Sequence, residues 1–139
     1  MKEPLRYSMA RTKEELEGSR QLIFEEYTRS GYISDQGAAI ALKTGKYLGL
    51  AGTATFILRY RDDIIGTMTI VRDGKNGVPM DDLYAEEINV IRKSGLKIAE
   101  VTQFAMRKGV QVGYLSQNKR LSAPYLSIPL LKLAFHYAL

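Results

Sequence analysis

The chain has 139 residues, 45% of them hydrophobic and 25% charged, which is the composition of an ordinary globular protein, and its length fits one domain over residues 1–139. It has no cysteine, no apolar run long enough to cross a bilayer, and no signal-peptide core at its N-terminus, so we exclude disulfides and thiolate nucleophiles and expect a cytoplasmic protein. The formal net charge is +5; residues 1–100 hold 15 basic and all 15 acidic residues, so the excess lies in residues 101–139.

The first predicted elements are a short strand and a helix. Alternation of apolar and polar residues predicts a strand within residues 1–8. The sequence Thr12-Lys-Glu-Glu15 is a capping box, because the Thr12 hydroxyl can accept from the Glu15 amide while the Glu15 carboxylate reaches back. It predicts a helix from about Lys13 to Arg29 that Gly31 ends. The expected apolar stripe of this helix is Leu16, Ile23, Phe24 and Tyr27.

A hairpin follows a stretch that stays open. Residues 34–52 allow either a helical turn at 38–44 or a glycine-rich loop. Residues 53–60 and 64–71 are rich in β-branched and aromatic residues around turn chemistry, which predicts an antiparallel pair of strands. The remaining predicted elements are a helix over 83–93 with Tyr84, Ile88 and Ile91 along one side, a buried strand over 97–106, and a last helix from Ser122 or Pro124 to the end.

This order of elements predicts an α/β (α+β) fold, a largely antiparallel sheet with helices packed on it. The strand at 97–106 needs a neighbour on its far side, and the last helix runs into residue 139 without a cap. We therefore expect that C-terminal strands are missing and that the domain is incomplete. Either the chain is a fragment, or a second copy completes the sheet in a homo-oligomer.

The best candidate for chemistry is a carboxylate in the middle of the last predicted strand. Alternation places Glu100 and Thr102 on one mostly apolar face, together with Ile98, Phe104 and Met106. Burial on such a face raises the pKa of a carboxyl group toward neutrality, as a general base requires. The alternative is a structural Glu100 paired with a lysine or arginine of an adjacent element.

Two further groups of residues are candidates for binding. Arg20 and Phe24 lie one turn apart on the first helix, where Arg20 either reaches a carboxylate at a site edge or is a surface arginine. The second group, which flanks a loop leading into a helix N-terminus that could hold a phosphate, is Arg107, Lys108, Lys119, Arg120 and Ser122. A solvated basic loop without a partner is the alternative reading of that group.

Several other functions find no support in the sequence. No P-loop or G-x-S-x-G elbow is present, and His136 is the only histidine, which leaves histidine-based triads without a second candidate. Acidic residues do not fall at metal-ligand spacing near it, so we expect no metal. The tyrosines are scattered and do not form a base-stacking motif, so we expect no nucleic-acid partner.

At this point residues 7–139 resemble a known family, the long-chain N-acyl amino acid synthases, which are cousins of the acyl-homoserine-lactone synthases within the Gcn5-related N-acetyltransferase fold. The segments that carry the resemblance are Gly66-Thr-Met-Thr-Ile-Val71, the helix from Pro79 to Arg92, Gly95, and Ala99-Glu-Val-Thr-Gln-Phe-Ala105. Glu100-Val-Thr-Gln-Phe104 is similar to the E-x-S/T-R-F motif of the lactone synthases, and Arg20 with Phe24 to their R-x-x-x-F pair.

The chain departs from this pattern in four ways. Gln103 replaces the arginine of the lactone-synthase motif, and tryptophan is absent, which argues against S-adenosylmethionine and favours an amino-acid acceptor. Family members continue past the last helix with further strands. The acetyl-CoA pyrophosphate signature of the wider fold is missing, since Arg107-Lys-Gly-Val-Gln-Val-Gly113 does not fit it. That is similar to members that use acyl carrier protein.

The resemblance implies transfer of a long-chain acyl group from an acyl carrier protein thioester to the amine of an amino acid. It implies that Glu100 accepts the proton or holds the ammonium, that Thr102 orients Glu100 or the amine, and that Arg20 steers the acceptor's carboxylate. The other implied substrate contacts are Phe24, Gln103, Phe104 and Met106. The basic residues would face acyl carrier protein or its phosphopantetheine phosphate, and no cofactor would stay bound, the acyl-phosphopantetheine thioester being a co-substrate.

Alternative readings remain open. One is an acyl-homoserine-lactone synthase or another N-acyltransferase that uses acyl- or acetyl-coenzyme A. The other belongs to a different class, a non-catalytic module that binds acyl thioesters or carrier protein.

Overall fold

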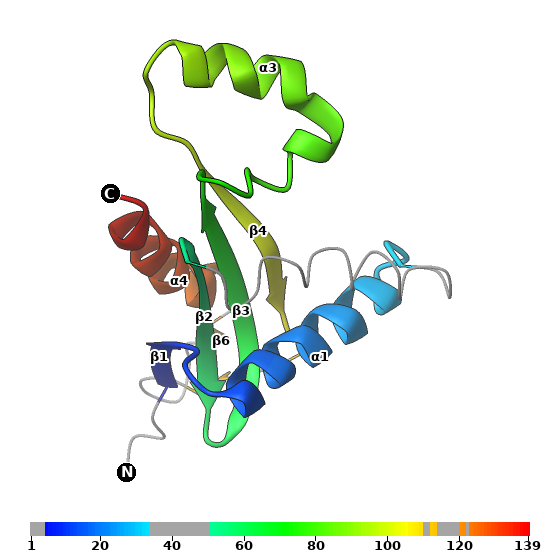
Figure 1. Cartoon of the computed structure of the whole chain (residues 1–139). Helices are drawn as coiled ribbons and strands as arrows, with labels where there is room; N and C mark the ends of the chain where they lie inside the picture. The colour runs from blue at the N-terminus through cyan, green and yellow to red at the C-terminus, as the bar shows by residue number, and fades with distance from the viewer. Residues whose placement is uncertain (1–4, 34–50, 110–111, 114–119, 122) are drawn as a thin grey trace.

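The chain folds around one antiparallel sheet. A computed structural model describes residues 5–33, 51–109, 112–113, 120–121 and 123–139. Its four main strands pair in the order β1-β2-β3-β4 (Figure 1). They are β1 (Leu5–Met9), β2 (Thr53–Tyr60), β3 (Asp63–Arg72) and β4 (Ala99–Met106). Two short strands, β5 (Val112–Gly113) and β6 (Arg120–Leu121), pair with each other.

Three helices surround this sheet: α1 (Lys13–Arg29), α3 (Asp81–Lys93) and α4 (Ala123–Ala138). Helices α1 and α4 cover opposite faces, and α3 stands beyond one end of the strands (Figure 1). The main hydrophobic core lies under α4 and comprises Ala54, Phe56, Leu58, Ile65, Met68, Ile70, Leu126, Leu130 and Ala134. The predicted α/β class, a sheet flanked by helices, is confirmed. No helix among the described residues is long and apolar enough to cross a membrane.

Helix α1 begins and ends where the sequence predicts, but it buries a different face. The capping box is present, with the Glu15 amide donating to the Thr12 hydroxyl at 3.1 Å and the Thr12 amide to the Glu15 carboxylate at 3.2 Å. The buried residues are Ser19, Leu22, Ile23 and Glu26. Phe24 is 43% exposed, so its assignment to the core was wrong. The helix tolerates the polar members of its inner face because hydrogen bonds satisfy them.

The predicted hairpin is confirmed as β2 and β3, joined by Arg61 and Asp62 with Arg61 at a positive φ of 55°. The expectation that the strand at 97–106 is buried was wrong. Strand β4 lies at the edge of the described sheet, and Val101 and Phe104 are each 41% exposed. Only Ala105 on this strand is fully buried.

A β-bulge interrupts β4 and changes the predicted alternation of its side chains. Thr69 pairs with Thr102 but Thr67 pairs with Ala105, so two residues of β4 oppose one residue of β3. Gln103, at the bulge, has a φ of 50°. Glu100 and Thr102 share the α1 side of the sheet, as predicted. Met106 does not join them, because it lies opposite Gly66 and packs into the core under α4.

Helix α3 begins at Asp81, two residues before the predicted start, and its backbone leaves helical geometry at Tyr84 (φ −130°, ψ 36°). Of the three residues predicted to line one side of this helix, Ile88 is buried, while Tyr84 is 49% and Ile91 40% exposed. Ile88 packs with Val71 and Val78 in a small cluster at the end of the sheet. The open prediction for residues 38–44 lies outside the described residues.

Candidate functional site

Glu100 lies where the first half of β4 meets the start of α3. It faces the same side of the sheet as its β3 partner Val71, and its side chain is partly buried. Its Oε2 atom accepts the backbone N–H of Met80 at 2.7 Å. Met80 is the N-cap residue of α3, so this carboxylate sits at the positive end of a helix, where an oxygen anion is stabilised.

The electrostatics of Glu100 match the sequence prediction. Burial raises the pKa of the Glu100 carboxyl, the Met80 N–H lowers it, and the negative charge of Asp81 raises it, with a net shift upward. In the part of the chain that the structure describes, Glu100 forms no ion pair with a lysine or arginine. The alternative of a structural ion pair at Glu100 therefore finds no support among these residues.

Thr102 lies beside Glu100 on this face and opposite Thr69 of β3. Thr69 is 1% exposed, and its hydroxyl is 2.8 Å from that of Thr55. A second buried pair continues toward α1, with the Ser19 hydroxyl 2.6 Å from the Thr67 hydroxyl. These hydroxyls satisfy one another, so the sheet carries a row of polar groups on its α1 side that leads to Thr102 and Glu100. The sequence analysis did not single them out, although threonines at alternate positions of β3 were a visible signal.

The loop between β3 and α3 is held by one guanidinium. Arg92 donates to both oxygens of Asp73 at 2.7 and 2.8 Å and to both oxygens of Asp81 at 2.7 and 2.6 Å. Arg92 holds the pKa of Asp73 below its usual range, and the two carboxylates raise the pKa of Arg92. No pattern in the sequence indicated this cluster.

The C-terminal half of α1 holds the other end of β4, away from Glu100. The Tyr27 hydroxyl donates to the Phe104 carbonyl oxygen at 3.2 Å, which fixes the backbone next to the bulge. Burial raises the pKa of Tyr27, so its phenol keeps its proton. Ala105 packs with Leu22 and Ile23. Gln103 is partly buried beside these contacts.

Arg20 and Phe24 both lie exposed on α1. Strand geometry separates Glu100 from Ala105, where α1 packs on β4, by roughly 15 Å along the strand. Among the described residues, no hydrogen bond or ion pair joins Arg20 to Glu100 or Thr102. The structure thus brings Glu100 and Thr102 together but does not bring the predicted α1 pair to them.

The basic residues after β4 are partly engaged within the protein. The Arg107 guanidinium donates to Glu25 of α1 at 3.0 Å, and its amide donates to Ile65. The Lys108 amide donates to Glu26 at 3.3 Å, while its side chain is exposed. The predicted Lys119 and Ser122 lie outside the described residues, as does the side chain of Arg120.

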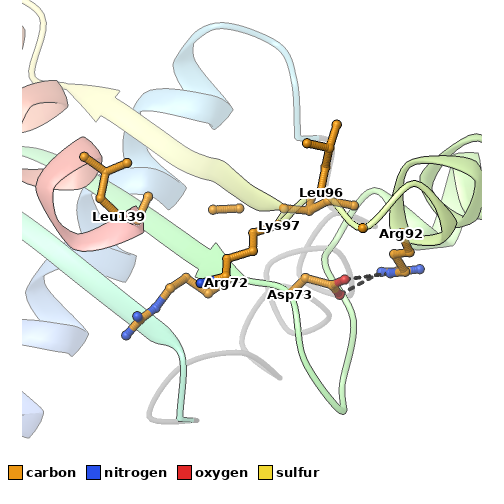
Figure 2. Close-up of a pocket in the computed structure, with 10 residues that line it drawn as sticks. Arg72, Asp73, Arg92, Leu96, Lys97 and Leu139 are labelled. Atoms are coloured by element: carbon orange, nitrogen blue, oxygen red, sulfur yellow. Dashed lines mark hydrogen bonds and ion pairs between the residues drawn. The ribbon is translucent and has the colours of Figure 1, made fainter.

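A cavity of about 740 Å³ opens between the ends of β3 and α4 and the start of β4 (Figure 2). Arg72, Lys97, Leu96 and Leu139 line it together with the Asp73–Arg92 pair. The Arg72 guanidinium also stacks over the Tyr137 ring at 4.2 Å. Phe104 and Met106, which the resemblance implies as substrate contacts, do not line this cavity, and neither does Glu100.

Within the described residues, no three histidine or acidic side chains converge as a metal site would require. A carboxylate with neighbouring hydroxyls, as at Glu100 and Thr102, can accept a proton, hold an ammonium and orient a nucleophile.

Comparisons with known proteins place this geometry in a family. A family model described as the N-acyl amino acid synthase FeeM matches residues 18–138. The solved structure of FeeM, an N-acyl amino acid synthase from uncultured soil microbes, is similar with a TM-score of 0.78 and 27% sequence identity. That similarity covers 97% of this chain and 65% of the FeeM chain, so this chain spans just under two thirds of its length. Curated proteins gave no match.

Proposed function

The chain belongs to the family of the N-acyl amino acid synthase FeeM, and on this premise we propose that it transfers an acyl group from a thioester to the amine of an amino acid. The donor in this proposal is a long-chain acyl group on the phosphopantetheine arm of acyl carrier protein. The family resemblance supports the reaction class, and the properties of Glu100 support the position of the chemistry.

One observation carries the proposal: a partly buried carboxylate on β4 has a raised pKa and accepts the backbone N–H of Met80. Met80 donates to Oε2, and no donor from the described residues reaches Oε1. An α-ammonium that approaches Oε1 would therefore displace no donor belonging to the described residues. The raised pKa makes Glu100 a better acceptor for a proton than an ordinary glutamate, because its charged form is less stabilised.

The proposed reaction is an aminolysis. Glu100 takes a proton from the ammonium, and the freed nitrogen lone pair attacks the thioester carbonyl carbon. A carbon–nitrogen bond forms, and the tetrahedral oxyanion is stabilised by a hydrogen-bond donor, typically a backbone amide. The carbon–sulfur bond then breaks, the newly bonded nitrogen gives up its extra proton to the leaving thiolate, and the amide and the thiol are released. Glu100 passes the first proton to water and is ready for the next amine. No covalent acyl-enzyme is part of this scheme, since the described site holds no activated nucleophile.

Thr102 is the second residue that we place at the reaction. It lies two positions from Glu100 on the same face, so its hydroxyl can orient the carboxylate or the incoming amine. We assign Gln103 and Phe104, which lie at the bulge in β4, to contacts with the acyl donor, whereas Met106 packs into the core under α4 and is left out of this assignment. The positions of Arg20 and Phe24 give the proposal no added support.

The basic C-terminal quarter supports the choice of donor. Residues 101–139 contain five lysines and arginines and no acidic residue. Acyl carrier protein is acidic, and complementary charge speeds and orients such encounters. Because Arg107 is already paired with Glu25, the exposed Lys108 is the described residue best placed to meet it.

The test is product formation. The chain is incubated with a long-chain acyl thioester on carrier protein or on coenzyme A and with a panel of amino acids, and amide and free thiol are quantified by mass spectrometry. We expect equal amounts of both, with carrier protein as the better donor. Binding of the carrier protein without any amide would overturn the enzymatic proposal in favour of a binding module. Amide formed only with S-adenosylmethionine would identify a lactone synthase instead.

A further inference from the structure

The Met80 N–H that reaches Glu100 belongs to a loop whose shape is set elsewhere. Residues 73–81 leave β3, turn back and enter α3. At the start of this loop the Asp73 amide donates to Ile98 at 2.9 Å, next to the beginning of β4. At its end Met80 donates to Glu100. The loop is thus connected to β4 at both of its ends.

Arg92 joins the same two ends through side chains. Its guanidinium binds Asp73 and Asp81, which flank the loop, with four donor–acceptor distances of 2.6 to 2.8 Å. Asp81 is the residue after Met80, and its Oδ2 also accepts the Val78 amide at 2.8 Å. Each carboxylate accepts two hydrogen bonds from the planar guanidinium, so the contacts fix the orientation of both carboxylates as well as their distance. The ammonium group of a lysine cannot do this.

The loop is built around this arrangement. Gly77 has a φ of 67°, and a Cβ atom there would lie 2.3 Å from the Asp81 Oδ2 atom. Glycine therefore allows both the turn and the close approach of the Asp81 carboxylate. Val78, the next residue, is 1% exposed and packs in the cluster with Ile88. The turn at Gly77 and the burial of Val78 both restrict the direction of the Met80 N–H, because they fix the backbone just before it.

We propose that Arg92 is a positioning residue for the proposed acyl transfer: by binding Asp73 and Asp81 it aims the Met80 N–H at Glu100 and keeps that carboxylate in place for the amine. The inference rests on the proposed function for its catalytic meaning, although the positioning itself is a property of the unliganded protein. Arg92 also neutralises Asp81, whose charge faces Glu100 together with the Met80 N–H. The bidentate contacts of the Arg92 guanidinium and its positive charge can be removed separately.

Three variants separate these effects. Arg92→Lys keeps the charge but loses the bidentate contacts, and Asp73→Asn removes one carboxylate while keeping its size. Lys93→Gln is the matched control, because Lys93 is the exposed neighbour of Arg92 on α3. Hydrogen exchange of the Met80 amide is followed by NMR in each variant. We expect roughly tenfold faster exchange in Arg92→Lys and Asp73→Asn, as for loss of a hydrogen bond to a charged group, and no change in Lys93→Gln.

A second pair of variants tests the link to Glu100. Met80→Pro deletes the donor, and Met80→Ala keeps it; the φ of Met80, −63°, is one that proline adopts. Because proline at the third position of the Val78–Asp81 turn also restricts Pro79 before it, a thermal melt and an amide spectrum accompany Met80→Pro. Loss of the N–H raises the pKa of Glu100 further, so the carboxyl titration, followed by ¹³C NMR, moves to higher pH in Met80→Pro and Arg92→Lys. The pH at which the rate of amide formation rises moves with it. In Met80→Ala both stay at the wild-type position.

The outcomes are distinct. Unchanged Met80 exchange and unchanged Glu100 titration in Arg92→Lys would overturn the inference, whatever the activity. A wild-type chain that forms no amide would overturn the proposed function, while the two NMR measurements would still decide the positioning role. Thermal melts identify any variant that fails to fold, and in that case Asp73→Asn decides.

Discussion

Replacing Glu100 by glutamine isolates its proton-accepting role. Glutamine has the same length, and its Oε1 atom can still accept the Met80 N–H that Glu100 accepts at 2.7 Å. The change therefore removes the charge and the basicity while keeping the hydrogen bond that positions the side chain. No ion pair among the described residues is broken.

The expected loss in turnover is about a hundredfold. A positioned general base contributes roughly 10²–10⁴ to a rate, and we take the lower bound because an amine at alkaline pH supplies part of its own free base. A hundredfold loss corresponds to about 2.7 kcal/mol of transition-state stabilisation. Because the interaction exists only when the proton moves, turnover should fall while the KM for the thioester stays close to the wild-type value.

The assay measures initial rates of amide formation across pH for wild type, Glu100→Gln and Glu87→Gln. Glu87 is an exposed glutamate on α3 and serves as the matched control. The wild-type rate should rise as Glu100 loses its proton, and this rise should vanish in Glu100→Gln but not in Glu87→Gln. A Glu100→Gln protein that folds normally and keeps wild-type turnover would refute the assignment of Glu100.

Three further predictions concern stability and binding. The folded-state pKa of Glu100 is raised above its ordinary value of 4.5, so its contribution to stability is present below that pH and is lost as pH rises through the folded pKa. In urea titrations the unfolding free energy of Glu100→Gln should therefore increase relative to that of wild type toward neutral pH. A difference that stays constant with pH would contradict this. Gly77→Ala should lower the unfolding free energy by about 1–3 kcal/mol through its positive φ and the clash with Asp81, whereas Gly74→Ala, with open space around it, should cost far less; equal losses would refute the reasoning. Lys108→Glu should weaken carrier-protein binding roughly threefold to tenfold in low-salt calorimetry, with the difference shrinking as salt is added, and unchanged affinity would remove the charge argument.

The features that were predicted correctly from the sequence depend on residues close together in the chain. The capping box at Thr12 and Glu15 specified the start of α1, because its hydrogen bonds form within one turn of helix. The β2–β3 hairpin was visible because β-branched residues flank a short turn. The pairing of Glu100 with Thr102 on one face followed from the two-residue period of a strand, and it held because both lie on the same side of the bulge.

The features that the sequence did not show arise from long-range contacts. The bulge at Gln103 moved Met106 to the other face, and no local residue pattern required it. Phe24 stayed exposed because packing on the sheet selected the face with Ser19 and Leu22. The Arg92 cluster joins residues 11 and 19 positions apart, and such pairings are set by tertiary structure. The hydrogen bond from Met80 to Glu100 joins residues 20 positions apart and is likewise set by tertiary structure.

The most direct test of the account is a crystal structure of this chain with an acceptor amino acid bound. The account predicts the amine nitrogen within hydrogen-bond distance, about 3 Å, of a Glu100 carboxylate oxygen while Met80 still holds the other oxygen. An amino acid bound elsewhere, with the Glu100 side chain turned to bulk water, would contradict it.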